Sequence, residues 1–317
     1  MEYRELGRTG LAVSRIALGT VELGMDYGFR SSPHYRKPEE ADAIRTIHQA
    51  IDLGINLIDT ARGYGKSEEI IGRALKESGS SRAPILAGKV AVSETFLSNG
   101  DDHALHAAMT QSIDESLRAL QVDTLDLLQI HNTSLAILNN EAAMRALDDA
   151  VQTGKARFLG ASCTGGPVSM AALADERTSA LQVPLNLLDR AMIPNVLPQA
   201  SNQGAGILVR SAFLRGVLTE NINDVPDELS DLRNAALSVR ESFRHQVSSL
   251  SELAIRFCLS FDAVSSIVVG MRNLSELEQN VLHAARGPLS DAQMEQLDCL
   301  TFRNPELLNP QNWQSVI

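Results

Sequence analysis

The sequence alternates between two kinds of segment along nearly its whole length. Short apolar runs end in polar residues or glycine, and most are followed by a longer amphipathic stretch with helical spacing. These runs are predicted to be strands: Arg15–Gly19, Asn56–Asp59, Pro84–Lys89, Leu125–His131, Arg157–Ser162, Ala180–Val183, Gly206–Val209 and Ser265–Val269. A repeat of strand and helix predicts an α/β fold with a parallel sheet covered by helices.

Two architectures build such a sheet, an open doubly wound sheet and a closed barrel. The glycine-rich GxGxxG loop that typically follows the first strand of the dinucleotide-binding open sheet is absent. We therefore predict a (β/α)8 TIM barrel. The segment from Tyr3 to Ser14 is predicted to be a β-hairpin that closes the bottom of the barrel. Because the chain carries no linker, repeat or low-complexity tract, we predict one domain spanning residues 1–317.

The helical stretches are clearest where glycine or a turn follows them. Four are predicted over Pro38–Leu53, Ser67–Ser78, His103–Leu120 and Asn140–Thr153. Two other segments, Glu22–Lys37 and the stretch from Ser211 to about Ser242, are longer than most loops. We expect both on the C-terminal face of the barrel, where barrel enzymes carry their active sites.

The charge balance and the N-terminus limit the classes of partner that we expect the protein to bind and the compartment in which we expect it. The formal net charge is −11 and no basic patch stands out, so we expect neither a nucleic-acid nor a membrane partner. No apolar stretch of signal-peptide or membrane-span length occurs near the N-terminus, which predicts a cytoplasmic protein. Three widely spaced cysteines predict neither a disulfide framework nor a metal site. No feature of the sequence indicates the oligomeric state.

Four ionisable residues fall at or just beyond the ends of three successive predicted strands. They are Asp59, Tyr64, Lys89 and His131. In a parallel barrel these strand ends are neighbours on one rim. A tyrosine needs a nearby cation to act as a proton donor at neutral pH, and Lys89 supplies one that Asp59 holds in place. His131 is placed to hydrogen-bond a carbonyl oxygen, so the set suits carbonyl chemistry with hydride from a nicotinamide.

Two other functions use the same residues. A lysine at a barrel strand end is also the nucleophile of a Schiff-base lyase, although Asp59 favours the charged form of Lys89 and argues against it. A non-catalytic barrel that binds a nicotinamide cofactor, as a sensor or as a partner of another protein, is the second alternative. A residue taken alone is weak evidence, because a strand-end aspartate is often a cap and a lysine usually faces solvent.

The run Asn56-Leu-Ile-Asp-Thr-Ala-Arg-Gly-Tyr-Gly-Lys-Ser-Glu68 resembles the signature of the aldo-keto reductase family. The likeness covers nearly the whole chain, from Leu6-Gly-Arg-Thr-Gly10 through Ala-Gly-Lys-Val at Lys89 and Leu-Gln-Ile-His at His131 to Asn280. The resemblance implies an NAD(P)-dependent oxidoreductase that acts on a small carbonyl substrate. It also implies that Tyr64 is the general acid or base, that Lys89 and Asp59 tune it, and that His131 positions the substrate.

The resemblance places the cofactor extended across the barrel mouth. The implied cofactor-binding residues are Gly19, Thr20, Asp59, Ser162, Cys163, Gln182, Arg210, Ser211, Phe213, Arg215, Gly216, Gly270, Arg272, Gln279 and Asn280. We expect NADP rather than NAD because Arg272 is placed for a 2′-phosphate, although Glu276 would repel one. Two positions depart from the family pattern. Cys163 stands where an asparagine is usual, and Arg210 stands where many relatives have a tyrosine that stacks on the nicotinamide, a contact that a planar guanidinium can also make.

The substrate pocket is less well marked. We expect Glu22, Tyr64, His131 and Asn132 around the substrate, and Tyr27, Phe29, Phe96 and Trp313 are further candidates. The polar side chains of Glu22 and Asn132 suit a hydroxylated substrate such as a sugar, but aldehydes and ketones stay open.

Overall fold

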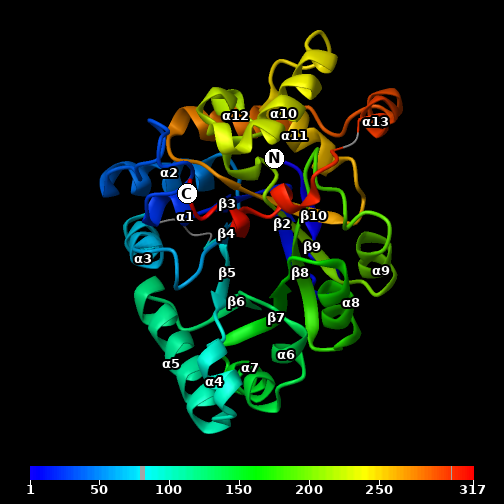
Figure 1. The fold of residues 1–317 in the computed structure, drawn as a ribbon. Helices are drawn as coiled ribbons and strands as arrows, with labels where there is room; N and C mark the ends of the chain where they lie inside the picture. The colour runs from blue at the N-terminus through cyan, green and yellow to red at the C-terminus, as the bar shows by residue number, and fades with distance from the viewer. Residues whose placement is uncertain (79–82, 301) are drawn as a thin grey trace.

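The computed structural model describes residues 1–78, 83–300 and 302–317, and within these ranges eight parallel strands close into a barrel. Helices surround the ring of strands (Figure 1). The strands follow one another around the barrel in chain order, and the last pairs with the first, as Gly270 with Gly19. The predicted (β/α)8 barrel is confirmed.

Each predicted strand occurs, with its ends within two residues of the prediction. The barrel strands are β3 (Ile16–Gly19), β4 (Leu57–Asp59), β5 (Ile85–Val90), β6 (Leu125–Ile130), β7 (Ala156–Ser162), β8 (Thr178–Pro184), β9 (Gly206–Arg210) and β10 (Val264–Gly270).

The helices that alternate with these strands form the outer layer. They are α1 (Val21–Gly24), α2 (Glu40–Asp52), α3 (Ser67–Glu77), α4 (Glu94–Asn99), α5 (Asp102–Leu120), α6 (Leu135–Leu138), α7 (Glu141–Gln152), α8 (Gly166–Ala174), α9 (Val196–Asn202), α10 (Ser230–Phe243), α11 (Leu250–Leu259), α12 (Leu274–Ala285) and α13 (Asp291–Asp298). The four predicted helices correspond to α2, α3, α5 and α7. No helix in the described ranges is long and apolar enough to cross a membrane.

The N-terminal segment forms the predicted hairpin, with β1 (Tyr3–Glu5) antiparallel to β2 (Ala12–Ser14). Leu6, in the turn, is fully buried against the lower ends of the barrel strands. The packing is so close that a Cβ atom on Gly206 would lie 2.5 Å from a Leu6 methyl carbon. Glycine at position 206 therefore lets the hairpin close the bottom of the barrel.

The barrel interior has two layers, because inward-facing positions recur at every second residue of a strand. The lower layer is apolar and is built from Leu57, Ala87, Leu127, Ala180 and Leu208 together with the hairpin. Two residues further along four of these strands, the inward side chains are polar and buried: Asp59, Lys89, Gln129 and Gln182. The change from apolar to polar along each strand marks the end of the barrel that carries chemistry.

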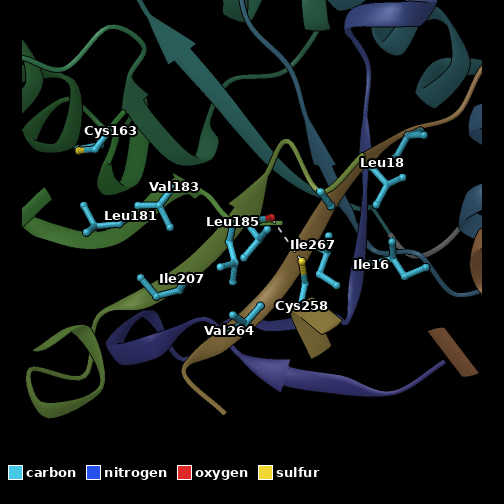
Figure 2. Close-up of a cluster of buried hydrophobic side chains, with 14 of the residues drawn as sticks. Ile16, Leu18, Cys163, Leu181, Val183, Leu185, Ile207, Cys258, Val264 and Ile267 are labelled. Carbon is cyan, nitrogen blue, oxygen red and sulfur yellow. Dashed lines mark hydrogen bonds between the residues drawn. The ribbon is translucent and has the colours of Figure 1, made fainter. Parts of the chain in front are cut away.

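The larger core lies outside the barrel, between the outward faces of the strands and the helices. Figure 2 shows part of it, in which Ile16, Ile207 and Ile267 from neighbouring strands pack with Cys258 of α11. Cys258 donates a hydrogen bond to the backbone oxygen of Leu185. This layer fixes the helices to the barrel and leaves the strand ends free to form a site.

Both long segments lie at the C-terminal end of the barrel, as predicted, since residues from each line the cavity described below. The second contains three short 3-10 turns, Leu214–Gly216, Glu220–Asp224 and Asp227–Leu229, followed by the fourteen-residue helix α10. Helix α10 was not predicted from the sequence. It forms because Leu232, Ala236, Val239 and Phe243 make one buried face along it.

Candidate active site

A cavity of about 860 Å³ opens at the carboxyl ends of the barrel strands. Its walls come from the strand ends, from the two long segments, from α12 and from the C-terminal tail. Ligand cavities of hundreds of cubic ångströms at this face of a barrel are typical of enzymes. The cavity is therefore the candidate active site.

The structure brings Asp59, Tyr64, Lys89 and His131 together at the floor of this cavity, and we call these four residues the tetrad. The Lys89 Nζ atom lies 2.5 Å from Asp59 Oδ1 and 3.4 Å from the Tyr64 hydroxyl. The Tyr64 and His131 rings meet edge to face with their centroids 5.5 Å apart. Lys89 is buried, whereas Tyr64 and His131 line the cavity. The tyrosine hydroxyl thus stands between a buried ammonium and the open space.

Electrostatics set the charge states of two of these groups. Burial lowers the pKa of Lys89, but the Asp59 carboxylate and the Tyr64 hydroxyl beside it outweigh burial, so its pKa is raised. Burial, with a smaller contribution from the Lys89 charge, lowers the pKa of His131 from its ordinary 6.5 to about 4. At neutral pH the lysine is therefore an ammonium and the imidazole is neutral.

Two amides complete the surroundings of Asp59. Gln182 Nε2 donates to Asp59 Oδ2 at 2.7 Å, and Gln129 Nε2 donates to the same oxygen at 3.3 Å. Gln129 was not among the predicted site residues. The signal was present, because Gln129 stands two residues after Leu127 in a predicted strand and therefore faces the barrel interior. The two amides hold the carboxylate from the side opposite Lys89.

A chain of hydroxyls fixes the rim next to Asp59. The Thr20 hydroxyl donates to the backbone oxygen of Asp59 at 2.8 Å and accepts from the Ser67 hydroxyl at 2.6 Å. The Thr60 hydroxyl lies 2.9 Å from Ser67 Oγ. Thr20, which the resemblance assigns to the cofactor, is fully buried in this chain and so orients the strand end that carries Asp59.

Almost all the predicted cofactor residues border the cavity. Those that line it are Gly19, Thr20, Asp59, Ser162, Gln182, Arg210, Ser211, Phe213, Arg215, Gly216, Gly270, Arg272, Gln279 and Asn280. Cys163 does not line it. The Cys163 side chain is fully buried and belongs to the outer core, part of which Figure 2 draws, and burial raises its pKa to about 11. The side chain therefore faces the outer core rather than the cavity.

The loop after β9 has the backbone of an anion site. Ser211, Leu214 and Arg215 have positive φ angles of 61°, 45° and 54°, which L-residues adopt rarely. Successive residues in such conformations can turn their N–H groups toward one space. Arg215 stacks on the Tyr27 ring with its guanidinium carbon 4.2 Å from the ring centroid. Its Nε atom is buried and has no hydrogen-bond partner among the described residues.

At the far end of the cavity, Arg272 lies between two carboxylates. Its Nη2 atom is 3.6 Å from Glu22 Oε1 and donates to the backbone oxygen of Tyr27 at 3.2 Å. Glu276 Oε2 accepts from the backbone N–H of Arg272 at 2.8 Å. Glu276 also caps α12 together with Asn273, so its carboxylate is already engaged.

The substrate candidates divide into two groups. Glu22, Tyr27, Phe29 and Asn132 line the cavity, as do Tyr64 and His131, whereas Phe96 and Trp313 do not. Asn132 donates to the backbone oxygen of Val92 and accepts from its N–H, so both ends of the amide are in use. Trp313 is buried beneath Phe29, with 5.9 Å between the ring centroids.

The C-terminal tail supplies wall residues that sequence analysis missed. Asn309, Gln311, Gln314 and Ile317 line the cavity, and so does His34 of the first long segment. No motif marks these positions. The tail reaches the cavity because Trp313 anchors it on Phe29 and because the backbone N–H of Arg30 donates to the Val316 oxygen at 3.2 Å.

Comparisons with known proteins agree with this geometry. Residues 15–301 match the model of the aldo/keto reductase family. The chain is 30% identical to L-galactose dehydrogenase of Arabidopsis thaliana over 93% of its own length and 91% of that protein. It is 34% identical to the aldo-keto reductase YhdN of Bacillus subtilis, over 80% of its own length and 75% of that protein.

A solved structure gives the same result in three dimensions. The holo form of an aldo-keto reductase from Bacillus halodurans superimposes with a TM-score of 0.78 at 26% identity, covering 95% of this chain and 96% of the other. Sequence, fold and cavity position all agree, and we conclude that the chain belongs to the aldo/keto reductase family of NAD(P)-dependent oxidoreductases.

Proposed function

We propose that the protein transfers hydride between NADP(H) and a small carbonyl compound, an aldehyde, a ketone or a sugar, with Tyr64 as the general acid or base. The observation that carries the proposal is the position of Lys89. Its ammonium lies 2.5 Å from a carboxylate oxygen of Asp59 and 3.4 Å from the Tyr64 hydroxyl. A cation held in this way stabilises a phenolate and makes the phenol a better proton donor.

Each side chain of the tetrad has its own role in the proposed reaction. In the reductive direction Tyr64 donates its hydroxyl proton to the carbonyl oxygen, and Lys89 stabilises the phenolate that remains. His131, neutral at pH 7, donates a hydrogen bond that orients the carbonyl. Asp59, held by Gln129 and Gln182, keeps Lys89 charged and in place. In the oxidative direction Tyr64 takes the proton from the alcohol.

The cavity residues fit a nicotinamide dinucleotide, which supplies or accepts hydride when it is bound. Ser162 and Gln182 stand beside the tetrad and would hold the carboxamide. The Ser211–Gly216 loop, with the unpartnered Nε atom of Arg215, would face the diphosphate. Asn280 on α12 would contact the adenine.

We propose NADP rather than NAD as the cofactor because the side chain of Arg272 lines the cavity near α12. There it would contact the 2′-phosphate, which NADP carries and NAD lacks. Glu22, whose Oε1 atom lies 3.6 Å from Arg272 Nη2, offsets part of its charge, which keeps NAD as the alternative cofactor. Replacing Arg272 with glutamine should therefore raise the Kd for NADPH by about tenfold and change the Kd for NADH little, since a hydrogen bond to a charged group such as the 2′-phosphate contributes about 1.5 to 3 kcal/mol.

A Schiff-base lyase is the weaker candidate. An amine must be neutral to attack a carbonyl, whereas Lys89 pairs with Asp59 and its pKa is raised. Borohydride trapping of a Lys89 adduct in the absence of nucleotide would favour the lyase.

The experiment that tests the proposed function has two steps. NADPH and NADH are first titrated by intrinsic fluorescence, and the preferred nucleotide is then tested with a panel of aldehydes, ketones and sugars by cofactor absorbance. The sugar and the polyol suggested by two relatives' names, L-galactose dehydrogenase and glycerol dehydrogenase, should be tested in the oxidative direction with NADP⁺ and NAD⁺ as hydride acceptors. We expect sub-millimolar binding and turnover of at least one carbonyl. Failure of both nucleotides to bind would exclude the proposal.

A further inference from the structure

Arg210, the last residue of β9, reaches sideways across the mouth of the barrel. Its Nη2 atom donates to the backbone oxygen of Cys163 at 3.2 Å and to the Thr164 hydroxyl at 3.0 Å, and its Nη1 atom donates to the Ser211 hydroxyl at 3.2 Å. Cys163 follows β7, and β8 lies between β7 and β9. The guanidinium therefore spans the carboxyl end of β8, the strand that carries Gln182.

These contacts use the edge of the guanidinium, because its N–H donors all lie in the plane of the group. Arg210 also lines the same cavity as Ser162 and Gln182. With the edge held by three oxygen atoms, the flat face is the surface that remains for a bound ring. This arrangement suits a stacking platform in the place where many relatives have a tyrosine.

The charge of Arg210 has no counterion in direct contact. Its three hydrogen-bond partners are neutral oxygens, and in the described ranges no carboxylate lies within 4.0 Å of it. This differs from Arg272, which has Glu22, and from Lys89, which has Asp59. The longer-range electrostatic partners of Arg210 are Tyr64, Tyr27, Cys163 and Asp189. A half-buried cation with no carboxylate in direct contact thus borders the part of the cavity next to the tetrad.

A tyrosine and an arginine at this position differ in charge, and so do the two redox forms of the cofactor. The nicotinamide ring is a cation in NADP⁺ and is neutral in NADPH, while the rest of the dinucleotide is the same in both. A guanidinium against the ring repels only the oxidised form, whereas an aromatic face attracts a cation.

We propose that Arg210 makes this site bind NADPH in preference to NADP⁺ by its positive charge. The inference rests on the proposed function, since it requires the nicotinamide to lie against Arg210. It concerns the ratio of two dissociation constants, so it is independent of which carbonyl compound is the substrate. Two charges a few ångströms apart near a protein surface interact strongly enough to make that ratio about tenfold or more.

The test is titration of the intact protein with NADPH and with NADP⁺, by fluorescence and calorimetry, in the wild type and three variants. Arg210→Gln keeps a planar polar group without the charge, and Arg210→Lys keeps the charge without the plane. Arg190→Gln is the matched control, because Arg190 is partly buried but bonds to Leu187, Leu297 and Asp298 outside the cavity. Thermal melts verify that each variant folds.

We expect the wild type and Arg190→Gln to bind NADPH at least about tenfold more tightly than NADP⁺. Arg210→Lys should keep most of this ratio, and Arg210→Gln should bring it close to one. Equal binding of the two forms by the wild type would overturn the inference even if no Arg210 variant folds. An unchanged ratio in Arg210→Gln, or an equal loss in the Lys and Gln variants, would also overturn it. If neither form binds the wild type, the proposed function itself fails.

Discussion

His131 shows how a single partly buried side chain of the site affects the stability of the fold. Burial, with help from the charge of Lys89, lowers its pKa from 6.5 to about 4, so the folded protein holds this imidazole neutral over a pH range in which the unfolded chain is protonated. The unfolded state therefore binds more protons between these two values. The free energy of unfolding that His131 contributes is present above pH 6.5 and is lost as the pH falls toward 4.

We predict that this loss amounts to roughly 3 kcal/mol over that range, at about 1.4 kcal/mol for each unit of pKa shift. Urea unfolding of the wild type and of His131→Gln as a function of pH measures it, and the variant should show the weaker dependence below pH 6.5. His103→Gln, an exposed histidine on α5, is the control and should follow the wild type. Parallel curves for the wild type and His131→Gln would contradict the prediction.

Residue identity alone did not predict which side chains are free to bind a ligand. Asn132 is committed to the backbone of Val92, Thr20 to that of Asp59, and Cys163 lies in the outer core. Each stands at the end of a predicted strand, and the motif assigned it to the correct strand end. The direction of its side chain depends on loop geometry and on neighbours far away in sequence, which a motif does not contain.

At the scale of elements, the N-terminal hairpin and the active site occupy opposite ends of the barrel. Leu6 is fully buried at the closed end, and the tetrad lies at the open end. Substitutions in the hairpin should therefore affect stability without affecting the chemistry.

We predict that Leu6→Ala lowers the free energy of unfolding by about 2 to 5 kcal/mol, the usual cost of removing a buried leucine side chain from a packed core. The KM for nucleotide and the kcat should stay within about twofold of the wild type at temperatures where the variant is folded. Leu282→Ala, 64% exposed on α12, should change stability by less than about 0.5 kcal/mol. Loss of nucleotide binding in folded Leu6→Ala would show that the two ends are coupled.

The strands were predictable because each is a short apolar run that ends in polar residues or glycine. Lys89 and Asp59 could be placed on one rim because both stand at the ends of such runs, and Gln129 could have been found because inward-facing positions recur at every second residue. The long segment after β9 was harder. Its helix α10 comes after three 3-10 turns. The helical spacing of apolar residues therefore begins far from any strand, and no clear start for the helix could be identified from the sequence.

At the scale of the whole molecule, the cavity unites parts of the chain that are far apart in sequence. Arg30 bonds to Val316, Ser32 donates to Asp224 at 2.7 Å, and Arg272 reaches the backbone of Tyr27. The first long segment is thus held against the second segment, the tail and α12. A site assembled in this way has its catalytic floor set by the strands and its walls set by loops, so the floor was predictable and the tail residues were not.

The central claim is that Tyr64 is the proton donor and acceptor of a nicotinamide-dependent reaction. Single-turnover reduction of the best carbonyl substrate by bound NADPH, in the wild type and in Tyr64→Phe, tests it most directly. Tyr3→Phe is the matched control, since its hydroxyl bonds to Gly54 at the opposite end of the barrel. We predict a fall in rate of about 10² to 10⁴ for Tyr64→Phe with its Kd for NADPH within about twofold of the wild type. A Tyr64→Phe variant that turns over as fast as Tyr3→Phe would contradict the claim.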